Sequence, residues 1–372
     1  MNKSISLYFH IPFCVRKCNY CAFYSVPSPS LVLVNDYCDA LMKQFRAFKA
    51  TEAGINVKSV YFGGGTPTVL GRDRLCGMLS EVISSGIIDK DCEVTVETNP
   101  LTADSEFFKG LISAGANRIS VGVQSLIDSE LKTLGRIHSA LDAEKCIDDA
   151  RKAGFENVSA DMIFGFNGHT TGSAGKTLHG LLSLGVTHIA AYSLQYEPGT
   201  PMFSLKNAPD AVTEDDEEAI YYLICEIMRD NGFRHYEISA FAKDDDHVSH
   251  HNLGYWQRRE YFGFGAAAHS CYNGKRFCAA QSIEKFIKTA DCRSPFAPTD
   301  YEGAKLLTED EIREESIMLG LRTDNGIDMS LISNARFAEK CVRSGLAVIK
   351  QNRFILTESG YRVSNSVIAE LI

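Results

Sequence analysis

The sequence lacks the features that carry a protein into or across a membrane. No apolar run approaches the roughly 18 residues of a membrane-spanning helix. Residues 1–10 contain no long apolar core followed by a small-residue cleavage site, so they do not resemble a secretory signal. We therefore expect a cytoplasmic protein without a transmembrane segment, and the sequence leaves contact with a membrane surface open.

Positive charge is also in short supply. The 38 Lys and Arg residues are outnumbered by 47 Asp and Glu residues, which gives a formal net charge of −9. A general nucleic-acid binder needs a cationic surface to neutralise phosphates, so we expect no nucleic-acid partner. At 372 residues, 45% of them hydrophobic, the chain is long enough for two domains or for one large domain with an appendage.

Six short segments rich in β-branched or aromatic residues alternate with amphipathic stretches. We expect strands at residues 5–10, 57–62, 93–98, 118–124, 158–164 and 188–194, and helices at residues 34–49, 72–84, 104–114, 141–153 and 213–231. Such repeats imply parallel strands joined by right-handed crossovers. Because a full eight-stranded barrel needs about 250 residues, we predict an α/β fold with an open, partial (β/α)6 barrel and a site at the carboxyl ends of its strands.

The alternation fades near residue 235, and we divide the chain into three parts there. Residues 1–235 are expected to form the barrel. Residues 236–300 form a Gly- and His-rich extension, in which we expect residues 244–252 to be a loop. Residues 301–372 predict a small C-terminal helical or winged-helix-like module, which the acidic composition assigns to packing against the barrel rather than to nucleic-acid binding.

Three of the twelve cysteines are not scattered through the chain. Cys14, Cys18 and Cys21 form a CxxxCxxC motif directly after the first expected strand. Three thiolates on one loop can hold three irons of a cubic iron–sulfur cluster and leave the fourth iron to another ligand. A zinc site with His10 as fourth ligand is the alternative, although structural zinc is usually bound by paired motifs that this chain does not have.

A CxxxCxxC loop after the first strand of a partial barrel resembles the radical S-adenosylmethionine superfamily. Within it, the chain is similar to the oxygen-independent coproporphyrinogen III oxidase family, and most similar to the haem chaperone branch of that family. The similarity rests on residues 8–14 (YFHIPFC), 63–67 (GGGTP), 121–125 (VGVQS) and 261–270 (YFGFGAAAHS). It implies a 4Fe–4S cluster on Cys14, Cys18 and Cys21, S-adenosylmethionine at the open iron, and an electron donor for the cluster.

The resemblance also implies a set of residues around S-adenosylmethionine. They are Tyr8, Tyr20, Gly64, Gly65, Thr66, Glu97, Gln124, Arg136, Asp161, Gln195 and His269. Arg136 suits the methionyl carboxylate because a guanidinium binds carboxylates in a bidentate manner. Plainer readings stay open for several of them: a tight turn for the glycines, a surface helix arginine, core aromatics for the tyrosines, and hydrogen-bonded strand ends for Glu97, Gln124 and Asp161.

Residues 251–256 read HNLGYW and contain the only tryptophan. On the expected loop, His251 could ligate haem iron while Tyr255 or Trp256 stacks on the macrocycle. His250 is an adjacent candidate, and a merely solvated loop histidine is the plainer reading. In the family the HNxxYW pattern is typical of the haem chaperone branch, so the resemblance implies haem as a ligand and haem-acceptor apo-proteins as partners.

Two departures distinguish the chain from the oxidases of this family. Phe23 stands where they carry a further cysteine after the triad, and Leu253 and Gly254 stand where they contact a second S-adenosylmethionine. We therefore predict a haem chaperone that carries a 4Fe–4S cluster and S-adenosylmethionine. An oxygen-independent coproporphyrinogen III oxidase of porphyrin biosynthesis is the alternative, and a zinc-containing binding protein is a third. Whether the chain is an enzyme stays open, and no catalytic residue is assigned.

Overall fold

A curved sheet is the main element of the computed structural model, which describes residues 3–52, 54–289 and 301–372. In these ranges the sheet has twelve strands in the order β14-β13-β12-β11-β1-β4-β5-β6-β7-β8-β10-β9. Six neighbouring strands are mutually parallel: β1 (Lys3–Ile11), β4 (Ile55–Gly64), β5 (Ile88–Thr98), β6 (Arg118–Gln124), β7 (Asn157–Phe164) and β8 (His188–Ser193). The open, partial (β/α)6 barrel expected from the sequence is confirmed.

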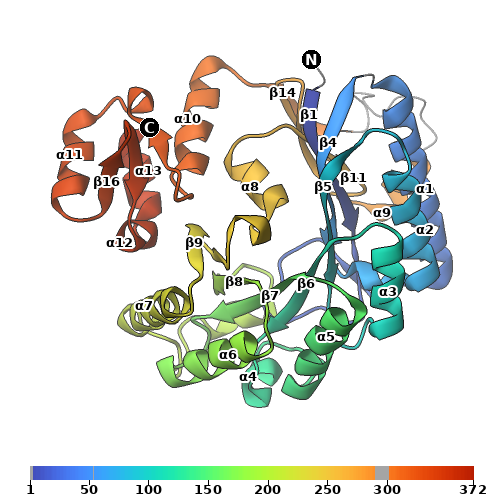
Figure 1. Ribbon diagram of the computed structural model, residues 1–372, viewed down its shortest axis with the longest axis horizontal. Coiled ribbons are helices and arrows are strands. Elements are labelled where there is room, and N and C mark those ends of the chain that lie inside the picture. Colours follow the sequence, from blue (N-terminus) through green and yellow to red (C-terminus); the bar gives the residue numbers. More distant parts are fainter. Residues whose placement is uncertain (1–2, 53, 290–300) are drawn as a thin grey trace.

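Helices cover the outer, convex face of this sheet (Figure 1). They are α1 (Leu31–Thr51), α2 (Arg72–Ile83), α3 (Ser105–Ser113), α4 (Asp128–Thr133), α5 (Ala140–Ala153), α6 (Thr171–Ser183) and α7 (Glu214–Asp230), and the short η1 (Pro67–Leu70) connects β4 to α2. Side chains alternate along each strand, so Ile119, Val121 and Val123 of β6 pack in the apolar core, where each is 0% exposed. The alternate residues Arg118 and Ser120 are polar and face the barrel interior.

Strands between residues 234 and 306 lengthen the sheet at both edges, so they begin before residue 236 and end after residue 300, the expected bounds of the extension. Beyond β8 lie β10 (Ala240–Ala242) and β9 (Arg234–Glu237), joined by a short η2 (Pro201–Leu205) and α7 to the barrel. Next to β1 lies β11 (Tyr261–Phe264), which is parallel to β1, and then come three antiparallel strands: β12 (His269–Tyr272), β13 (Lys275–Ala279) and β14 (Tyr301–Leu306). Helix α9 (Ile283–Thr289) follows β13. The main sheet therefore continues past the expected boundary at residue 300.

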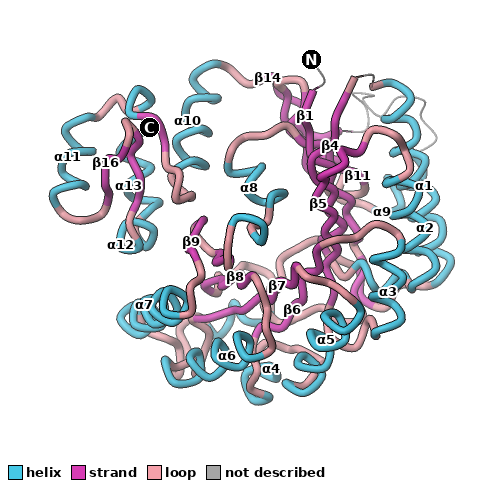
Figure 2. Tube along the Cα trace, viewed as in Figure 1, coloured by secondary structure: helices cyan, strands magenta, loops and turns pink. Residues whose placement is uncertain are grey.

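The expectation of a loop at residues 244–252 is wrong. This segment forms η3 (Asp245–His247) and the first turn of α8 (His250–Trp256). Figure 2 shows α8 on the inner side of the curved sheet. A seven-residue helix is not stable alone in water, so α8 depends on its contacts with the barrel.

The C-terminal module forms a separate small core. Its elements are α10 (Glu309–Gly320), β15 (Ile327–Asp328), η4 (Met329–Leu331), α11 (Ala335–Arg343), β16 (Ala347–Lys350), β17 (Arg353–Leu356), α12 (Glu358–Arg362) and α13 (Ser364–Leu371). Its strands pair in the order β15-β17-β16, so the helices and hairpin expected for this module are present. In the described ranges, no helix is both long enough and apolar enough to cross a bilayer.

Candidate cluster and cofactor site

The cysteine loop begins where β1 ends. It starts with β2 (Phe13–Cys14), which pairs with β3 (Val26–Pro27) and closes the loop upon itself. The loop is attached to the end of β4 because Gly65 N–H donates to the carbonyl of Ile11 at 2.9 Å and Thr66 N–H donates to that of Phe13 at 2.7 Å. A Cβ on Gly65 would lie 2.6 Å from the Phe13 carbonyl oxygen, so the glycine permits this close approach.

The three thiols of this loop share one environment. Cys14, Cys18 and Cys21 are half-buried, and none forms a disulfide. Burial raises the pKa of Cys14 and of Cys21, and repulsion from neighbouring thiolates raises both further. Thr66 Oγ1 lies 3.7 Å from the sulfur of Cys14, and Nη1 of Arg136 lies 3.3 Å from that of Cys18. A cluster bound here would therefore have a cation and a hydroxyl at its edge.

The spacing of these ligands argues against zinc. A tetrahedral ion with Zn–S bonds of about 2.3 Å places its sulfurs about 3.8 Å apart. In the part of the chain that the structure describes, neither the three cysteines nor His10 belongs to a group of three ligand atoms within 4.8 Å of one another. The His10 ring is engaged elsewhere, by Tyr8 Oη at 2.8 Å and the Tyr24 carbonyl at 3.4 Å. Three thiols without a fourth protein ligand fit a cubic cluster better.

Arg136 connects the cysteine loop to the barrel strands. Its Nη1 lies 3.5 Å from Tyr20 Oη, and its Nη2 donates to the Gly122 carbonyl at 2.6 Å and to Oδ1 of Asn99. The reading of Arg136 as a surface helix arginine is therefore wrong. A Cβ on Gly122 would meet the side-chain ends of Asn99 and Arg136, so a larger residue here would displace them.

Asn99 is a site residue that the sequence interpretation missed. Its Nδ2 donates to Thr66 Oγ1 at 2.6 Å, so it joins Thr66 to Arg136. The available signal was its position, since it directly follows the strand ending at Thr98. Polar residues at the carboxyl ends of barrel strands commonly belong to the active site.

Two acids face the barrel interior. Glu97 accepts hydrogen bonds from Tyr61 Oη at 2.7 Å and from Gly64 N–H at 3.0 Å. Asp161 accepts one from Ser120 Oγ at 3.1 Å. Burial raises the pKa of Glu97 to about 7 and that of Asp161 to about 6, and their mutual repulsion contributes to the shift of Glu97. Both acids can therefore exchange a proton close to neutral pH.

Of the remaining residues expected around S-adenosylmethionine, some lie in the barrel interior and others are exposed. Gln124 is buried at the end of β6 with φ of 70°, a left-handed conformation that is strained for a residue with a Cβ. Tyr8 packs against Tyr61 in the barrel interior, with ring centroids 6.1 Å apart. Gln195 is exposed after β8, and His269 is exposed at the start of β12. In the described chain neither Gln195 nor His269 is hydrogen-bonded to the cysteine loop.

His251 is in the barrel interior rather than on a loop. It is 1% exposed, with Nδ1 at 2.9 Å from Ser59 Oγ and Nε2 at 2.8 Å from Tyr255 Oη. Burial lowers the pKa of His251 to about 3. Trp256 lies under the guanidinium of Arg322, 5.7 Å from it. The reading of His251 as a solvated loop residue is therefore wrong, and both its ring nitrogens already have partners.

Comparison with known proteins identifies the family of this chain. The Radical SAM superfamily matches residues 8–179. The protein named heme chaperone HemW of Bacillus subtilis (strain 168) is 36% identical over 349 residues, covering 91% of this chain and 87% of its own length. This chain belongs to the HemW family of radical SAM proteins. The HemW of Haemophilus influenzae is 34% identical, covering 77% of this chain and 74% of its own length.

A protein from a vertebrate and the solved structure of an oxidase are also similar to this chain. The radical S-adenosyl methionine domain-containing protein 1, mitochondrial, of Danio rerio is 32% identical, with coverage of 87% of this chain and 73% of that protein. The solved structure of coproporphyrinogen III oxidase (HemN) from Escherichia coli superposes with a TM-score of 0.85, covering 100% of this chain and 90% of that one. At 19% identity, this likeness concerns the fold alone.

Membership in the superfamily implies a 4Fe–4S cluster and S-adenosylmethionine, and the donor set fits both. Cys14, Cys18 and Cys21 would hold the cluster through three thiolates, and His10, the fourth ligand considered, is hydrogen-bonded elsewhere in the described chain. When bound, such a cluster would supply an electron to S-adenosylmethionine. The chain's own residues hold the loop, through Gly65 and Thr66, and place the guanidinium of Arg136 beside Cys18.

Proposed function

We propose that this protein is a haem chaperone that binds haem and delivers it to acceptor apo-proteins, and that it carries a 4Fe–4S cluster and S-adenosylmethionine. The observation that carries this proposal is the 36% identity, over nine-tenths of the chain, to a protein named heme chaperone. The partners that follow are haem, the acceptor proteins and an electron donor for the cluster. We propose the cytoplasm as the place where it works.

The oxidase alternative is supported by the fold alone. Phe23, at the position where the oxidases carry a further cysteine, is 72% exposed, so no packing requirement explains it. Leu253 and Gly254 lie on α8, where they offer no polar side chain to a second S-adenosylmethionine. Both features favour the chaperone.

The cofactor roles follow from the geometry of the cysteine loop. We assign the methionyl carboxylate of S-adenosylmethionine to Arg136, because this cation lies beside Cys18 and is already fixed by the Gly122 carbonyl. Glu97 and Asp161 face the same interior and, when ionised, attract the positively charged sulfonium. We assign Gln124, Thr66 and Tyr20 as further polar contacts of S-adenosylmethionine.

We propose haem contacts for His251, Tyr255 and Trp256, and these contacts require a change in the structure around His251. To bind iron, His251 must release Ser59 or Tyr255, because both ring nitrogens are hydrogen-bonded. Haem ligation by His251 therefore requires α8 to move away from the barrel interior. His250 needs no such movement, since it is exposed at the start of the same helix.

The test is an anaerobic reconstitution with iron and sulfide, followed by two measurements. We expect haem titration to show a saturable site, and incubation with dithionite, S-adenosylmethionine and coproporphyrinogen III to yield no protoporphyrinogen. Product formation at a steady rate would overturn the chaperone assignment, whereas failure to assemble any cluster would overturn the cofactor assignment.

The matched variants His251→Ala and His250→Ala locate the haem ligand. A selective loss of haem affinity in His251→Ala, with an unchanged cluster content, supports ligation after opening of α8. A loss in His250→Ala alone moves the ligand to the exposed neighbour.

A further inference from the structure

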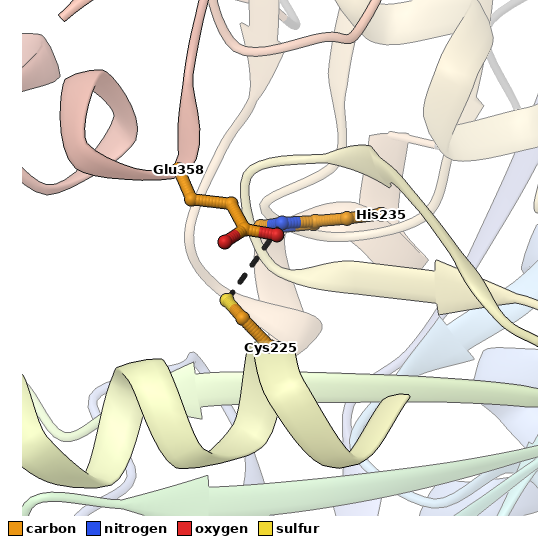
Figure 3. Close-up of side chains that lie close together, drawn as sticks. All are labelled: Cys225, His235 and Glu358. Atoms are coloured by element: carbon orange, nitrogen blue, oxygen red, sulfur yellow. Dashed lines mark hydrogen bonds between the residues drawn. The ribbon is translucent and has the colours of Figure 1, made fainter. Parts of the chain in front are cut away.

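Three potential metal ligands meet where the barrel contacts the C-terminal module. Figure 3 shows the side chains of Cys225 from α7, His235 from β9 and Glu358 from α12 pointing toward one another. A sulfur, a ring nitrogen and a carboxylate oxygen from these residues all lie within 4.8 Å of one another. These residues belong neither to the cysteine loop nor to α8, so the proposed function makes no use of them.

The spacing of the three ligand atoms is close to that around a tetrahedral ion. The sulfur of Cys225 and Nδ1 of His235 are 4.0 Å apart. Zinc bonds of about 2.3 Å to sulfur and about 2.1 Å to nitrogen, at tetrahedral angles, place these two atoms about 3.6 Å apart. A side-chain adjustment of a few tenths of an ångström therefore suffices to bring both atoms to one ion.

His235 is oriented to offer Nδ1 to this point. Its Nε2–H donates to the carbonyl of Ile238 at 3.4 Å, which leaves Nδ1 with the lone pair that faces the sulfur. Ligating histidines usually donate their other N–H to a carbonyl or carboxylate in this way. The ring stacks on Phe241 with centroids 4.2 Å apart and meets the edge of Tyr361, so its orientation is fixed. Burial lowers the pKa of His235 to about 4, so the ring is neutral.

Glu358 is held in place by groups that leave it able to ligate. Nη1 of Arg229 lies 3.2 and 3.3 Å from its two carboxylate oxygens, and Tyr221 Oη donates to its backbone carbonyl at 3.2 Å. A carboxylate has lone pairs enough to accept from Arg229 on one oxygen and to bind an ion with the other. Arg229 then acts as the outer partner that orients the ligand.

We propose that Cys225, His235 and Glu358 bind one zinc ion, with a water molecule completing the tetrahedron. A thiolate, an imidazole and a carboxylate form a donor set that suits zinc. The ion replaces the thiol proton of Cys225: the S–H bond breaks, a Zn–S bond forms, and the proton passes to solvent without any change of oxidation state. Because the ligands come from α7, β9 and α12, the ion fastens the C-terminal module to the barrel.

The test uses the full-length protein with Cys14, Cys18 and Cys21 replaced by serine, so that no metal binds at the cysteine loop. The probe is Co²⁺, whose visible absorption reports tetrahedral coordination and whose near-ultraviolet absorption reports a bound thiolate. We expect one Co²⁺ per chain, displacement by an equimolar amount of Zn²⁺, and a zinc-dependent rise of the thermal unfolding midpoint.

Variants then assign the ligands. His235→Asn should abolish the cobalt spectrum, Cys225→Ser should remove its near-ultraviolet band, and Glu358→Gln should weaken cobalt binding at least about tenfold, because a lost ligand costs at least as much as a lost outer partner. The matched control Cys146→Ser, at a buried cysteine of α5, should bind cobalt as the parent does.

Two outcomes overturn the proposal. One is the absence of tetrahedral cobalt bands in the parent, and the other is an unchanged spectrum in His235→Asn. If Cys225→Ser does not fold, unchanged cobalt affinity in Glu358→Gln also overturns the proposal, because the Glu358 side chain is 35% exposed and its replacement leaves no cavity. A zinc determination on the wild-type protein with its cluster in place shows whether the site is filled independently of the cluster.

Discussion

The carboxylate of Glu93 accepts the backbone N–H groups of both His250 and His251 at 2.8 Å. Glu93 lies on β5 and the histidines open α8, 157 and 158 residues later in the chain. A helix begins with N–H groups that have no partner within the helix, and here a barrel strand supplies the acceptor. This contact, together with Ser59 and His251, fixes the HNxxYW helix in the barrel interior.

Replacement of Glu93 tests this contact. Glu93→Ala leaves the N–H of His251 buried without an acceptor, so we expect the free energy of unfolding to fall by about 2–4 kcal/mol. The measurement is urea unfolding of the apo-protein. The matched control is Glu106→Ala, because the side chain of Glu106 is 67% exposed and forms a surface ion pair with Lys109; there we expect a change below about 0.5 kcal/mol. Equal losses in the two variants would contradict the role of Glu93.

Serine in place of any one of Cys14, Cys18 or Cys21 should prevent cluster assembly. The loop provides three thiolates and no spare ligand, since His10 is engaged by Tyr8 and Tyr24. We expect iron and sulfide after anaerobic reconstitution to fall from about four of each per chain to near zero. Cys76→Ser is the control, because Cys76 is half-buried on α2 and outside the loop. A variant of the triad with full iron and sulfide would refute the ligand assignment.

Arg136→Lys should separate cofactor binding from cluster binding. Lysine keeps the charge but loses the fork that spans Cys18 on one side and Gly122 on the other. We expect an unchanged cluster content and an affinity for S-adenosylmethionine at least about tenfold weaker, measured by anaerobic calorimetric titration. Unchanged affinity would assign the methionyl carboxylate to another residue, and loss of the cluster would make Arg136 a support of the loop alone.

The sequence predicted the barrel well because its signals are local. A short run rich in β-branched residues placed β6 at its observed bounds. Gly115 and Gly154 follow α3 and α5 with φ of 106° and 115°, the left-handed conformation that ends a helix. The motif CxxxCxxC, read together with the strand before it, was enough to locate the cysteine loop.

What the sequence did not predict depends on contacts between distant segments. Helix α8 has few apolar residues and a central Gly254, so its local signal is that of a loop, and its acceptor Glu93 comes from another strand. Strand β11 is short and becomes a barrel strand only by pairing with β1. Asn99 looks like an ordinary turn residue until the fold brings Thr66 and Arg136 to its two ends.

Glu97 should give the stability of the apo-protein a distinct pH dependence. Its pKa is about 7 in the folded protein against an ordinary value of 4.5, because burial disfavours the carboxylate. The folded state thus holds the Glu97 proton more tightly than the unfolded state. The resulting contribution to the free energy of unfolding is fully present below pH 4.5 and is lost as the pH rises through 7. The glutamine of Glu97→Gln cannot ionise, so this variant does not lose stability as the pH rises through 7. We expect the free energy of unfolding of Glu97→Gln, relative to that of wild type, to rise by about 3 kcal/mol between pH 4.5 and pH 8.

Urea unfolding at several pH values, with wild type and Glu97→Gln measured side by side, gives this difference directly. Glu106→Gln serves as the control, since an exposed carboxylate paired with Lys109 should show a nearly constant difference over the same range. The buried acid Asp161 titrates in the same interval with a pKa of about 6, but it is present in all three proteins, so its contribution largely cancels from the comparison. The prediction fails if the difference in free energy of unfolding between Glu97→Gln and wild type stays constant or falls as the pH rises. Glu97 would then be ionised in the folded protein at neutral pH, and the barrel interior would be better solvated than the burial of Glu97 indicates.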